Sequence, residues 1–489
     1  MESLAAQDAT MYWLSARGPT DLFLLYCFTD AGLPGAELRE FIARRSARIP
    51  ELAVRLRRTP GELNQPFWTA SQFHSEQFRQ HEIPDADWHA VSRELGVLLG
   101  TRVEAAEFPW RLHVFRGVRG VPGTGVTGDS ALVAVLQVSH ALVDGRGAAR
   151  IARALFGARE PAPVASETGA LSAVLGGKVL RACPGTGVSG AMAAGGVLRA
   201  VHRAAALGAL HATDALRAVA GVVQFPWRVG ATVVRGVGAA RARRELAART
   251  AAGEIPPPGP GFRPGPLNPS APLAGHVARV LVLPAVALRA PDRTVTVLAL
   301  TAISVALDRY LAERGHRGER LGAQVPVAIP AGAGGRNNYR SVGIELHTGV
   351  PELRERSALI AGELAARRAR AAHPLLLAQD RVTAVLPAAL LRRDVERYPD
   401  AVPSEIAGHT VVSSVHRGPA DLSFGGGAVH WSCGFPALGS VMHVTHGVHG
   451  LGDTVTLSVH ADPAAMPDPD RYLEIMAAAV AEVGAAHGD

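Results

Sequence analysis

The first third of the chain alternates short apolar runs with segments of helical periodicity. Continuous aliphatic or aromatic runs predict strands with little exposed surface. Three such strands are expected, at Leu22–Phe28, Arg111–Phe115 and Ala131–Val138. Apolar positions three and four residues apart predict amphipathic helices. These are expected at Glu37–Ile49, Trp88–Leu99 and Arg146–Phe156. This order of strands and helices predicts an α/β fold.

The same mixture returns in the last two-fifths of the chain. Strands are predicted at Val277–Leu283, Gln324–Ile329, Val342–His347, Thr410–Val415, Ala428–Ser432, Val441–Thr445 and Thr454–His460. Helices are predicted at Thr294–Arg314, Glu352–Ala371 and Pro469–Val483. Asp292 or Thr294 is a candidate N-cap for the first of these helices, because short polar side chains cap free N–H groups.

A segment of different composition separates the two halves. Residues 176–250 are rich in Ala and Gly and predict helices broken at Pro184 and Pro226. Residues 255–272 are dense in Pro and Gly, which is typical of a connector. We therefore predict two α/β subdomains with mixed sheets, residues 1–175 and 273–489, joined by a helical linker at 176–272.

Composition and charge refine this picture. At 489 residues the chain is too long for one ordinary core, and with 48% hydrophobic and 19% charged residues it belongs to the folded class. The net charge of +7 is local, because residues 178–249 hold eleven basic and two acidic side chains. Such a segment suits an anionic membrane surface or an acidic ligand, although a solvated helical face is an equally good interpretation. With few aromatic residues interleaved, nucleic-acid binding has little support.

Cysteine usage and the N-terminus bear on the compartment. The three cysteines lie far apart and form no Cys-x-x-Cys pair: Cys27, Cys183 and Cys433. A disulfide scaffold is therefore disfavoured, and a reducing cytoplasm fits. The N-terminus resembles no signal peptide, and Ala182–Leu198 is too rich in Gly for a good membrane span. We expect a cytoplasmic protein that is soluble or peripheral to a membrane.

The strongest chemical motif is Ser139-His140-Ala141-Leu142-Val143-Asp144-Gly145, directly after the predicted strand Ala131–Val138. A histidine can take a proton from an alcohol or amine that attacks an acyl carbon. A turn closed by Gly145, with Asp144 four residues after His140, would hold the ring in one orientation. On the pattern alone, however, a histidine at a strand end is more often structural, so the interpretation depends on its context.

That context is a family resemblance. The His-x-x-x-Asp-Gly run resembles the signature of the superfamily of chloramphenicol acetyltransferase, peptide-synthetase condensation domains and bacterial wax ester synthase/diacylglycerol acyltransferases. Three more segments resemble motifs of the last group, its Pro-Leu-Trp, Pro-Leu-Asn and Ser-Asn-Val segments. They are Phe108–Phe115 with Pro109 and Trp110, Pro266-Leu267-Asn268, and Val411–Val415 with Ser413 and Ser414. Their order and separation also agree, so the resemblance covers nearly the whole chain.

The resemblance implies two chloramphenicol-acetyltransferase-like subdomains with a channel between them. It implies that His140 is the general base and that Asp144 is mainly architectural, tied to a buried arginine. Acyl-CoA would be a co-substrate, with no bound cofactor and no metal. The acyl group would pass directly to a long-chain alcohol or diacylglycerol, giving wax esters or triacylglycerol. The enzyme would rest on a membrane or lipid droplet through residues 178–249. The absence of a Gly-x-Ser-x-Gly nucleophile elbow agrees with direct transfer.

Two departures from the family leave other functions open. Ser139 stands where the family usually has a first histidine, and Val295-Thr296-Val297-Leu298 stands where it commonly has an Asn-Asp pair. One alternative is a specialised acyltransferase of secondary metabolism, acylating a hydroxyl or amine from CoA or a carrier protein. Another is a lipid-binding relative without catalysis. Acyl length, acceptor and oligomeric state do not follow from the sequence.

Three further motifs favour ordinary structural roles. His443, His446 and His449 have a spacing that suggests a metal only on a helix, so loop or channel-lining histidines are expected instead. Gly425-Gly426-Gly427 lies between predicted strands and indicates a hairpin turn rather than a phosphate loop. Arg336-Asn337-Asn338-Tyr339 could contact a CoA phosphate, but we expect a solvated loop.

Overall fold

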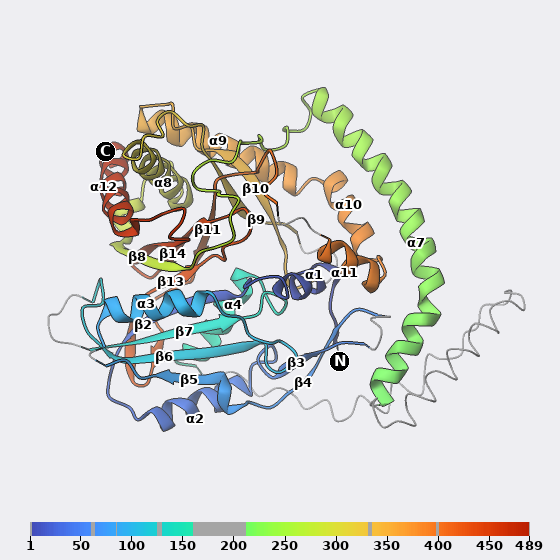
Figure 1. Ribbon diagram of the computed structural model, residues 1–489, viewed down its shortest axis with the longest axis horizontal. Helices are drawn as coiled ribbons and strands as arrows, with labels where there is room; N and C mark the ends of the chain where they lie inside the picture. The colour runs from blue at the N-terminus through green and yellow to red at the C-terminus, as the bar shows by residue number, and fades with distance from the viewer. Residues whose placement is uncertain are drawn as a thin grey trace, which may run out of the picture.

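A computed structural model describes residues 2–59, 64–84, 86–124, 130–159, 212–330, 335–397 and 401–488. The N-terminal half forms the lower layer in Figure 1 and most of the C-terminal half forms the upper layer. The expectations placed on residues 160–211, including the break at Pro184 and the weak membrane candidate Ala182–Leu198, lie outside the described residues.

The first large sheet has six strands in the order β12-β13-β2-β7-β6-β5. Their bounds are β2 Leu22–Thr29, β5 Phe78–His81, β6 Trp110–Val118, β7 Ala131–Val138, β12 Ser423–Phe424 and β13 Gly427–Phe435. Helices α2 (Gly35–Ser46) and α4 (Gly145–Phe156) pack on one face, and α3 (Trp88–Leu99) packs on the other. All eight residues of β7 are buried, including Gln137, as its mostly apolar sequence predicts.

The second large sheet also has six strands, in the order β10-β9-β11-β14-β15-β8. Their bounds are β8 Val277–Pro284, β9 Gly322–Ala328, β10 Tyr339–Glu345, β11 Thr410–His416, β14 Val444–Leu451 and β15 Thr454–Ala461. The helices of this half are α8 Val295–Ala312, α9 Leu353–Ala371, α10 Pro374–Thr383, α11 Ala388–Glu396 and α12 Pro469–His487, with a short 3-10 turn η3 at Ala285–Leu288. The two-sheet α/β fold class predicted from the sequence is confirmed.

Strands β12 and β13 belong to the first sheet, although they lie within 273–489. Strand β13 pairs antiparallel with β2, joining Cys433 to Leu25 and Phe435 to Phe23. The chain position of this strand predicts the second sheet, and only its long-range partners assign it to the first. The exchange places buried Trp431 and Cys433 in a core shared by both halves, together with Val280 of β8. The two halves are therefore joined by apolar packing as well as by chain connection.

A small third sheet and an N-terminal helix complete the first half. The sheet has the order β1-β4-β3, from Glu2–Ser3, Phe67–Ala70 and Val54–Arg57. Helix α1 (Ala6–Ser15) follows β1 and packs against α11. A 3-10 turn, η2, lies at Ser75–Gln77. These elements are too short for a clear hydrophobic period, and the sequence pattern did not predict them.

In the described part of the linker, helix α7 runs without interruption from Ala212 to Ala251. The predicted break at Pro226 is therefore wrong. An interior proline removes one hydrogen bond at a cost of about 3 kcal/mol, but that cost is confined to one turn. The following turns are held against the rest of the protein: Arg228 donates to Asn64 Oδ1 at 2.8 Å and Arg235 donates to the Arg381 carbonyl at 3.1 Å. Figure 1 shows α7 lying along the outside of both halves.

Helix α8 is long and apolar enough to cross a membrane, yet 72% of its 18 residues are buried inside the protein. It is the central helix of the second core, in contact with α9 and α12. Its N-cap is Thr294, whose hydroxyl accepts the Val297 N–H at 3.3 Å, which resolves the choice between Asp292 and Thr294. The apolar residues of α8 therefore belong to the protein core.

Candidate active site

His140 lies in the turn between β7 and α4, as the sequence predicts. The turn is short, because the Leu142 N–H donates to the Ser139 carbonyl at 2.9 Å. The Ser139 N–H donates to the Pro109 carbonyl at 2.8 Å, which ties the start of the turn to the strand next to it. Ser139 is buried and His140 is half-buried. The imidazole therefore projects from a turn whose backbone is fixed at its first residue.

Asp144 ends the turn by capping helix α4. Its Oδ1 accepts the Gly147 N–H at 2.8 Å, and its Oδ2 accepts the Asn338 N–H at 3.4 Å. The first contact is expected, because the opening turn of a helix leaves N–H groups without partners. The second comes from the other half of the protein. The expected tie to a buried arginine is absent from the hydrogen bonds of Asp144 among the described residues, and two backbone amides take its place.

The glycines of the motif have roles other than those the sequence predicts. Gly145 is the first residue of α4 and has no positive φ, so the turn does not depend on its flexibility. A Cβ there would meet only Val415 Cγ2, at 3.9 Å. At Gly147, by contrast, a Cβ would lie 2.8 Å from Val143 Cβ, closer than carbon atoms approach. Gly147, two residues beyond the Ser139–Gly145 motif, is the glycine that close packing requires.

A second loop, residues 335–339, lies against this turn. The expectation of a solvated loop is wrong, since Asn337 is only 1% exposed. Its Nδ2 donates to the His140 carbonyl at 2.8 Å. The Tyr339 hydroxyl lies 3.4 Å from His140 Nε2, and the two rings are 5.7 Å apart. Asn337 and Tyr339 are thus the nearest partners of His140 from the second half.

The protonation of His140 is set by this enclosure. Burial lowers the pKa of His140, while its own carbonyl, Asn337, Asp144 and Asp8 act in the opposite direction. A lowered pKa keeps the imidazole neutral near pH 7, the form that accepts a proton. Burial and the charge of Asp144 raise the pKa of Tyr339 to about 12, so its hydroxyl stays protonated and can donate a hydrogen bond.

Pro109 and Trp110 support the turn from the adjacent strand. Trp110 pairs with Val138 across the β6–β7 ladder, two residues before His140. Its ring is fully buried, and its Nε1 donates to the Leu52 carbonyl at 2.9 Å. A large ring at the root of the turn fixes the end of β7 through packing. The segment that resembles the family's Pro-Leu-Trp motif therefore lies beside the histidine.

Strand β11, the serine strand that carries Ser413 and Ser414, approaches the His140 turn from the second half. Val415 of β11 lies within van der Waals reach of Gly145. One residue earlier, the Ser414 hydroxyl is 2.8 Å from that of Thr296, in the first turn of α8. The helix start that departs from the family's Asn-Asp pattern is thus bonded to the serine strand, whose other serine is Ser413. This pair of hydroxyls lies within the second half, between α8 and β11.

Asn268 lies elsewhere. Its Nδ2 donates to the carbonyls of Val441 and His409, at 2.7 and 3.2 Å. His409 immediately precedes β11, whose far end carries Val415 near Gly145. Six residues of strand separate these ends, on the order of 20 Å. The Pro-Leu-Asn turn therefore holds the second sheet together and does not line the surroundings of His140.

The three spaced histidines are all buried. The expected loop position holds for His443, which lies in the bend before β14, whereas His446 and His449 are part of that strand. His443 Nδ1 is 2.7 Å from Asp462 Oδ2, with both side chains inaccessible to solvent. His446 lies between the hydroxyls of Thr410 and Tyr472, at 2.8 and 2.7 Å. Within the part of the chain that the structure describes, no three His, Cys, Asp or Glu side chains are placed to hold a metal ion.

Two other candidates have structural explanations. Gly425 and Gly426 have φ of 60° and 84° in the tight turn between β12 and β13, as the expected hairpin requires. The buried thiols Cys27 and Cys433 are unpaired, and burial raises the pKa of Cys27 to about 12. A thiol held protonated in this way is no nucleophile. Cys183 lies outside the described residues.

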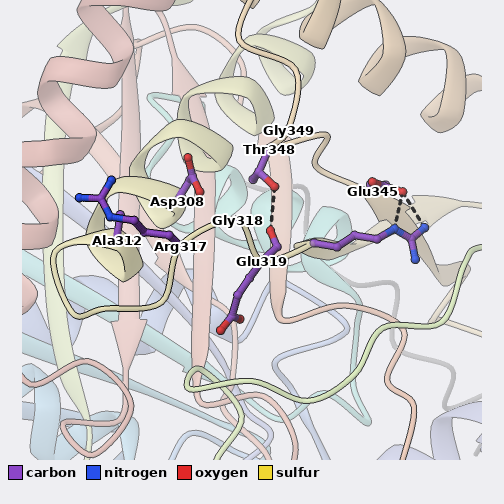
Figure 2. A pocket seen from close by; sticks show the side chains of 9 residues that line it. Asp308, Ala312, Arg317, Gly318, Glu319, Glu345, Thr348 and Gly349 are labelled. Atoms are coloured by element: carbon purple, nitrogen blue, oxygen red, sulfur yellow. Dashed lines mark hydrogen bonds and ion pairs between the residues drawn. The ribbon is translucent and has the colours of Figure 1, made fainter.

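The described residues form a polar surface pocket of about 420 Å³ in the second half (Figure 2). It is lined by Asp308 and Ala312 of α8, the loop around Glu319, and Glu345, which pairs with Arg320. Tyr339, whose hydroxyl lies 3.4 Å from His140 Nε2, and Glu345 of the pocket are at opposite ends of β10, on the order of 20 Å apart. The pocket is therefore remote from His140 and takes no part in the chemistry below.

No protein-family model matches the chain, and no curated protein sequence does. In three dimensions it is similar to the wax ester synthase/diacylglycerol acyltransferase from Marinobacter aquaeolei VT8, with a TM-score of 0.59, 17% identity and 100% of both chains covered. It is also similar to the starter condensation domain of rhizomide synthetase in complex with C8-CoA and Leu-SNAC, with a TM-score of 0.52 and 14% identity, covering 100% of this chain and 94% of that one.

This chain has the acyltransferase/condensation-domain fold. The likeness confirms the two-subdomain fold that the sequence resemblance implies. At 14–17% identity it shows the fold alone, so the reaction and the substrate rest on the residues around His140.

Proposed function

We propose that the protein is an acyl-CoA-dependent O-acyltransferase in which His140 is the general base. One observation carries the proposal: a half-buried histidine projects from a short, hydrogen-bonded turn where the two halves meet. Its Nδ1 is buried, whereas Nε2 faces the Tyr339 hydroxyl. Nε2 is therefore the atom that would take the proton, and Asp144 fixes the turn as an architectural residue.

The proposed reaction is a direct transfer. The acceptor hydroxyl gives its proton to His140 Nε2 as its oxygen attacks the thioester carbonyl carbon. The tetrahedral intermediate collapses, the carbon–sulfur bond breaks, and the CoA thiolate takes the proton from the imidazolium. Atoms and charge balance without a cofactor or a covalent enzyme intermediate. A base with a lowered pKa also returns this proton readily, which favours turnover.

We propose a long-chain alcohol or diacylglycerol as the acceptor, giving wax esters or triacylglycerol. The matching segment at Pro109–Trp110, beside the His140 turn, supports this choice. So does the one at Ser413–Ser414, which is followed by Val415 near Gly145. The likeness to the Marinobacter enzyme over the whole of both chains also supports it.

A specialised acyltransferase, acylating a hydroxyl or amine from CoA or a carrier protein, is the second candidate. The pair of hydroxyls at Thr296 and Ser414 favours it, because these short side chains stand where the family carries longer amides and an acid. Ser139 in place of the first family histidine points the same way. A changed contact between α8 and β11 shifts the strand that carries Val415 near Gly145, and with it the space for the acceptor.

The test is thiol release from a panel of acyl-CoAs of increasing length. Each is offered with a long-chain alcohol, a diacylglycerol, a small alcohol, an amine or no acceptor. The proposal predicts release that depends on both a long acyl chain and a lipid acceptor. Release with only a small alcohol or an amine would favour the second candidate. No acceptor-dependent release from any pair would contradict the enzyme proposal and leave a lipid-binding relative.

We also propose that α7 places the enzyme on an anionic membrane or lipid-droplet surface, as a cytoplasmic peripheral protein. Apolar side chains on the outer face of this helix are exposed: Trp227 by 67%, Val233 by 62%, Val234 by 73% and Val237 by 50%. Seven-, three- and four-residue steps from Trp227 lead to exposed Arg241 on the same face. An apolar stripe that ends in arginines suits a lipid interface with anionic headgroups. The described part of the proposed contact 178–249 is this helix.

Vesicle binding tests the surface. Reversing the charge of Arg241, Arg243 and Arg244 to Glu is expected to abolish co-sedimentation with phosphatidylglycerol vesicles, since each basic residue contributes on the order of 1 kcal/mol. Unchanged co-sedimentation contradicts the proposal.

A matched control changes the same number of charges elsewhere on the surface. Arg93, Arg289 and Arg317 are exposed and lie outside α7. Reversing these three is expected to leave vesicle binding within about two-fold. Equal losses in both triple variants would show that net charge, rather than the helix, governs binding.

A further inference from the structure

A buried acidic side chain of the first helix reaches the catalytic turn through the second loop. Asp8 of α1 is 2% exposed and Asn337 is 1% exposed. Asp8 Oδ2 accepts the Arg336 N–H at 3.0 Å. Asp8 Oδ1 accepts both the backbone N–H and the Nδ2 of Asn337, at 3.1 and 2.9 Å. The same Nδ2 donates to the His140 carbonyl at 2.8 Å. One chain of hydrogen bonds thus joins residues 8, 337 and 140.

Burying the Asp8 carboxylate costs folding free energy, which suggests a role beyond packing. A buried carboxylate loses its hydration, which raises the pKa of Asp8, and three N–H donors offset that cost only in part. Asn337 Oδ1 and His140 Nδ1 are both buried and both lack a hydrogen-bond partner. An unpaired buried polar atom costs about 1–3 kcal/mol. The two atoms lie on side chains of residues joined by the Asn337–His140 hydrogen bond, and Asn337 acts against burial to raise the pKa of His140.

We propose that Asp8 and Asn337 are positioning residues for the catalytic base: Asp8 holds the Asn337 amide, and Asn337 holds the backbone of the His140 turn. The inference rests on the proposed function and goes beyond it, since neither residue belongs to the motif. A base must lie within a few tenths of an ångström of its working position. Residues of both halves would then set that position jointly.

The other groups around the ring are fixed by the same contacts. The charged or titratable side chains that face His140 are Asp144 at the start of α4, Asp8 on α1 and the Tyr339 hydroxyl on β10. Arg336 lies beside Asp8 and moderates its charge. Removing the Asn337 amide changes no charge in this set. It therefore separates positioning from electrostatics.

The test compares Asn337→Ser with the wild-type protein. The variant is expected to lower kcat about 10- to 100-fold, with the KM for acyl-CoA changed less than about three-fold. The rate at which diethyl pyrocarbonate modifies His140, read by peptide mass spectrometry, is expected to rise as the ring loses its fixed position. Unchanged kcat and unchanged modification would overturn the proposal.

A paired exchange distinguishes positioning from simple stability. In the double variant Asp8→Asn/Asn337→Asp, the new amide at position 8 can donate to the new carboxylate at 337. That carboxylate has no hydrogen to donate to the His140 carbonyl. Thermal stability is therefore expected to recover relative to Asn337→Asp alone, while kcat stays low. Recovery of both would show a purely structural role and overturn the proposal.

The control is Asp462→Asn, another fully buried carboxylate. Asp462 accepts the backbone N–H groups of Ala274 and Ala464, both at 3.1 Å, and contacts His443. This variant is expected to lower the melting temperature and leave kcat and the modification of His140 unchanged. An equal fall in kcat in Asp462→Asn would assign the effect to general destabilisation. If the wild-type protein transfers no acyl group, the proposed function fails, yet His140 modification in Asn337→Ser still decides the positioning role.

Discussion

Two loops meet at His140, and they are held in different ways. The turn from Ser139 to Asp144 is fixed by bonds within a few residues, such as Leu142 N–H to the Ser139 carbonyl and Gly147 N–H to Asp144. The loop 335–339 is fixed by partners more than 190 residues away in the chain, Asp8 and His140. The proposed base thus sits on a locally folded turn, and a loop of the other half is bonded to the backbone of that turn. If His140 is the base, as we propose, packing of the two halves and the position of the base are coupled.

This contrast predicts different responses to mutation. Changes in the 139–145 turn should damage helix α4 and the base together. Changes in the 335–339 loop should spare α4 and loosen the base alone.

Replacing Asp144 should have the largest effect. Asp144→Ala removes the cap on Gly147 and the contact with the Asn338 N–H. We expect kcat to fall about 100-fold, because the turn loses its anchor. The free energy of unfolding should fall by about 1–2 kcal/mol. Steady-state thiol release and chemical denaturation measure the two.

Asp144→Asn is the matched comparison, since asparagine also caps helices. It should keep stability within about 0.5 kcal/mol of wild type. If Asp144→Ala is as stable and as active as Asp144→Asn, local capping does not hold the turn.

The next effect concerns the glycines. Gly147→Ala places a Cβ 2.8 Å from Val143 Cβ, and the turn must shift to make room. We expect kcat to fall about ten-fold and stability to fall by about 1–3 kcal/mol. Gly145→Ala meets only Val415 at 3.9 Å and should cost less than about three-fold. The reverse order of the two losses would contradict the packing described for this turn.

A smaller effect is expected from pH. Burial lowers the pKa of His140 from its ordinary value of 6.5. The neutral base is lost only as the pH falls through this lowered pKa, so kcat/KM should stay nearly constant from pH 8 down to about 6.5. The acid limb of the profile of kcat/KM against pH measures the pKa of His140. A midpoint above 6.5 would show that the base is exposed or stabilised as a cation.

The smallest effect belongs to the hydroxyl pair between α8 and β11. Thr296→Val removes the hydrogen bond to Ser414 and keeps the shape of the side chain. The net value of such a bond is about 1 kcal/mol, so stability should change little. The KM for the acceptor should change more than kcat if the pair borders the acceptor path. A change in kcat alone would place the pair in the acid–base chemistry instead.

Local sequence accounts for much of the fold. The bounds of β7 and α3 match their predicted ranges, and those of α4 and β8 match within one residue. Each of these elements could be predicted because its own residues form an apolar run or a helical period. The place of β13 in the first sheet could not be predicted, since its pairing with β2 is a contact between distant segments. Helix α7 also differs, because its later turns are held by contacts that a local proline rule does not include.

The site divides in the same way. His140 and Asp144 could be named from a seven-residue run. Asn337 was visible only as part of a polar loop, and Asp8 only as an acidic residue near the N-terminus. Each acquires its role from burial against the other. Their spacing of 329 residues leaves no pattern for a single sequence to display.

The most direct test of the central claim is acceptor-dependent thiol release by His140→Ala, measured beside the wild type and the exposed-surface variant His316→Ala. The account predicts a loss of at least about 100-fold for His140→Ala, the usual contribution of a general base, with a folded protein that still binds acyl-CoA. His316→Ala should match the wild type. A His140→Ala protein that releases thiol at the wild-type rate would contradict the account.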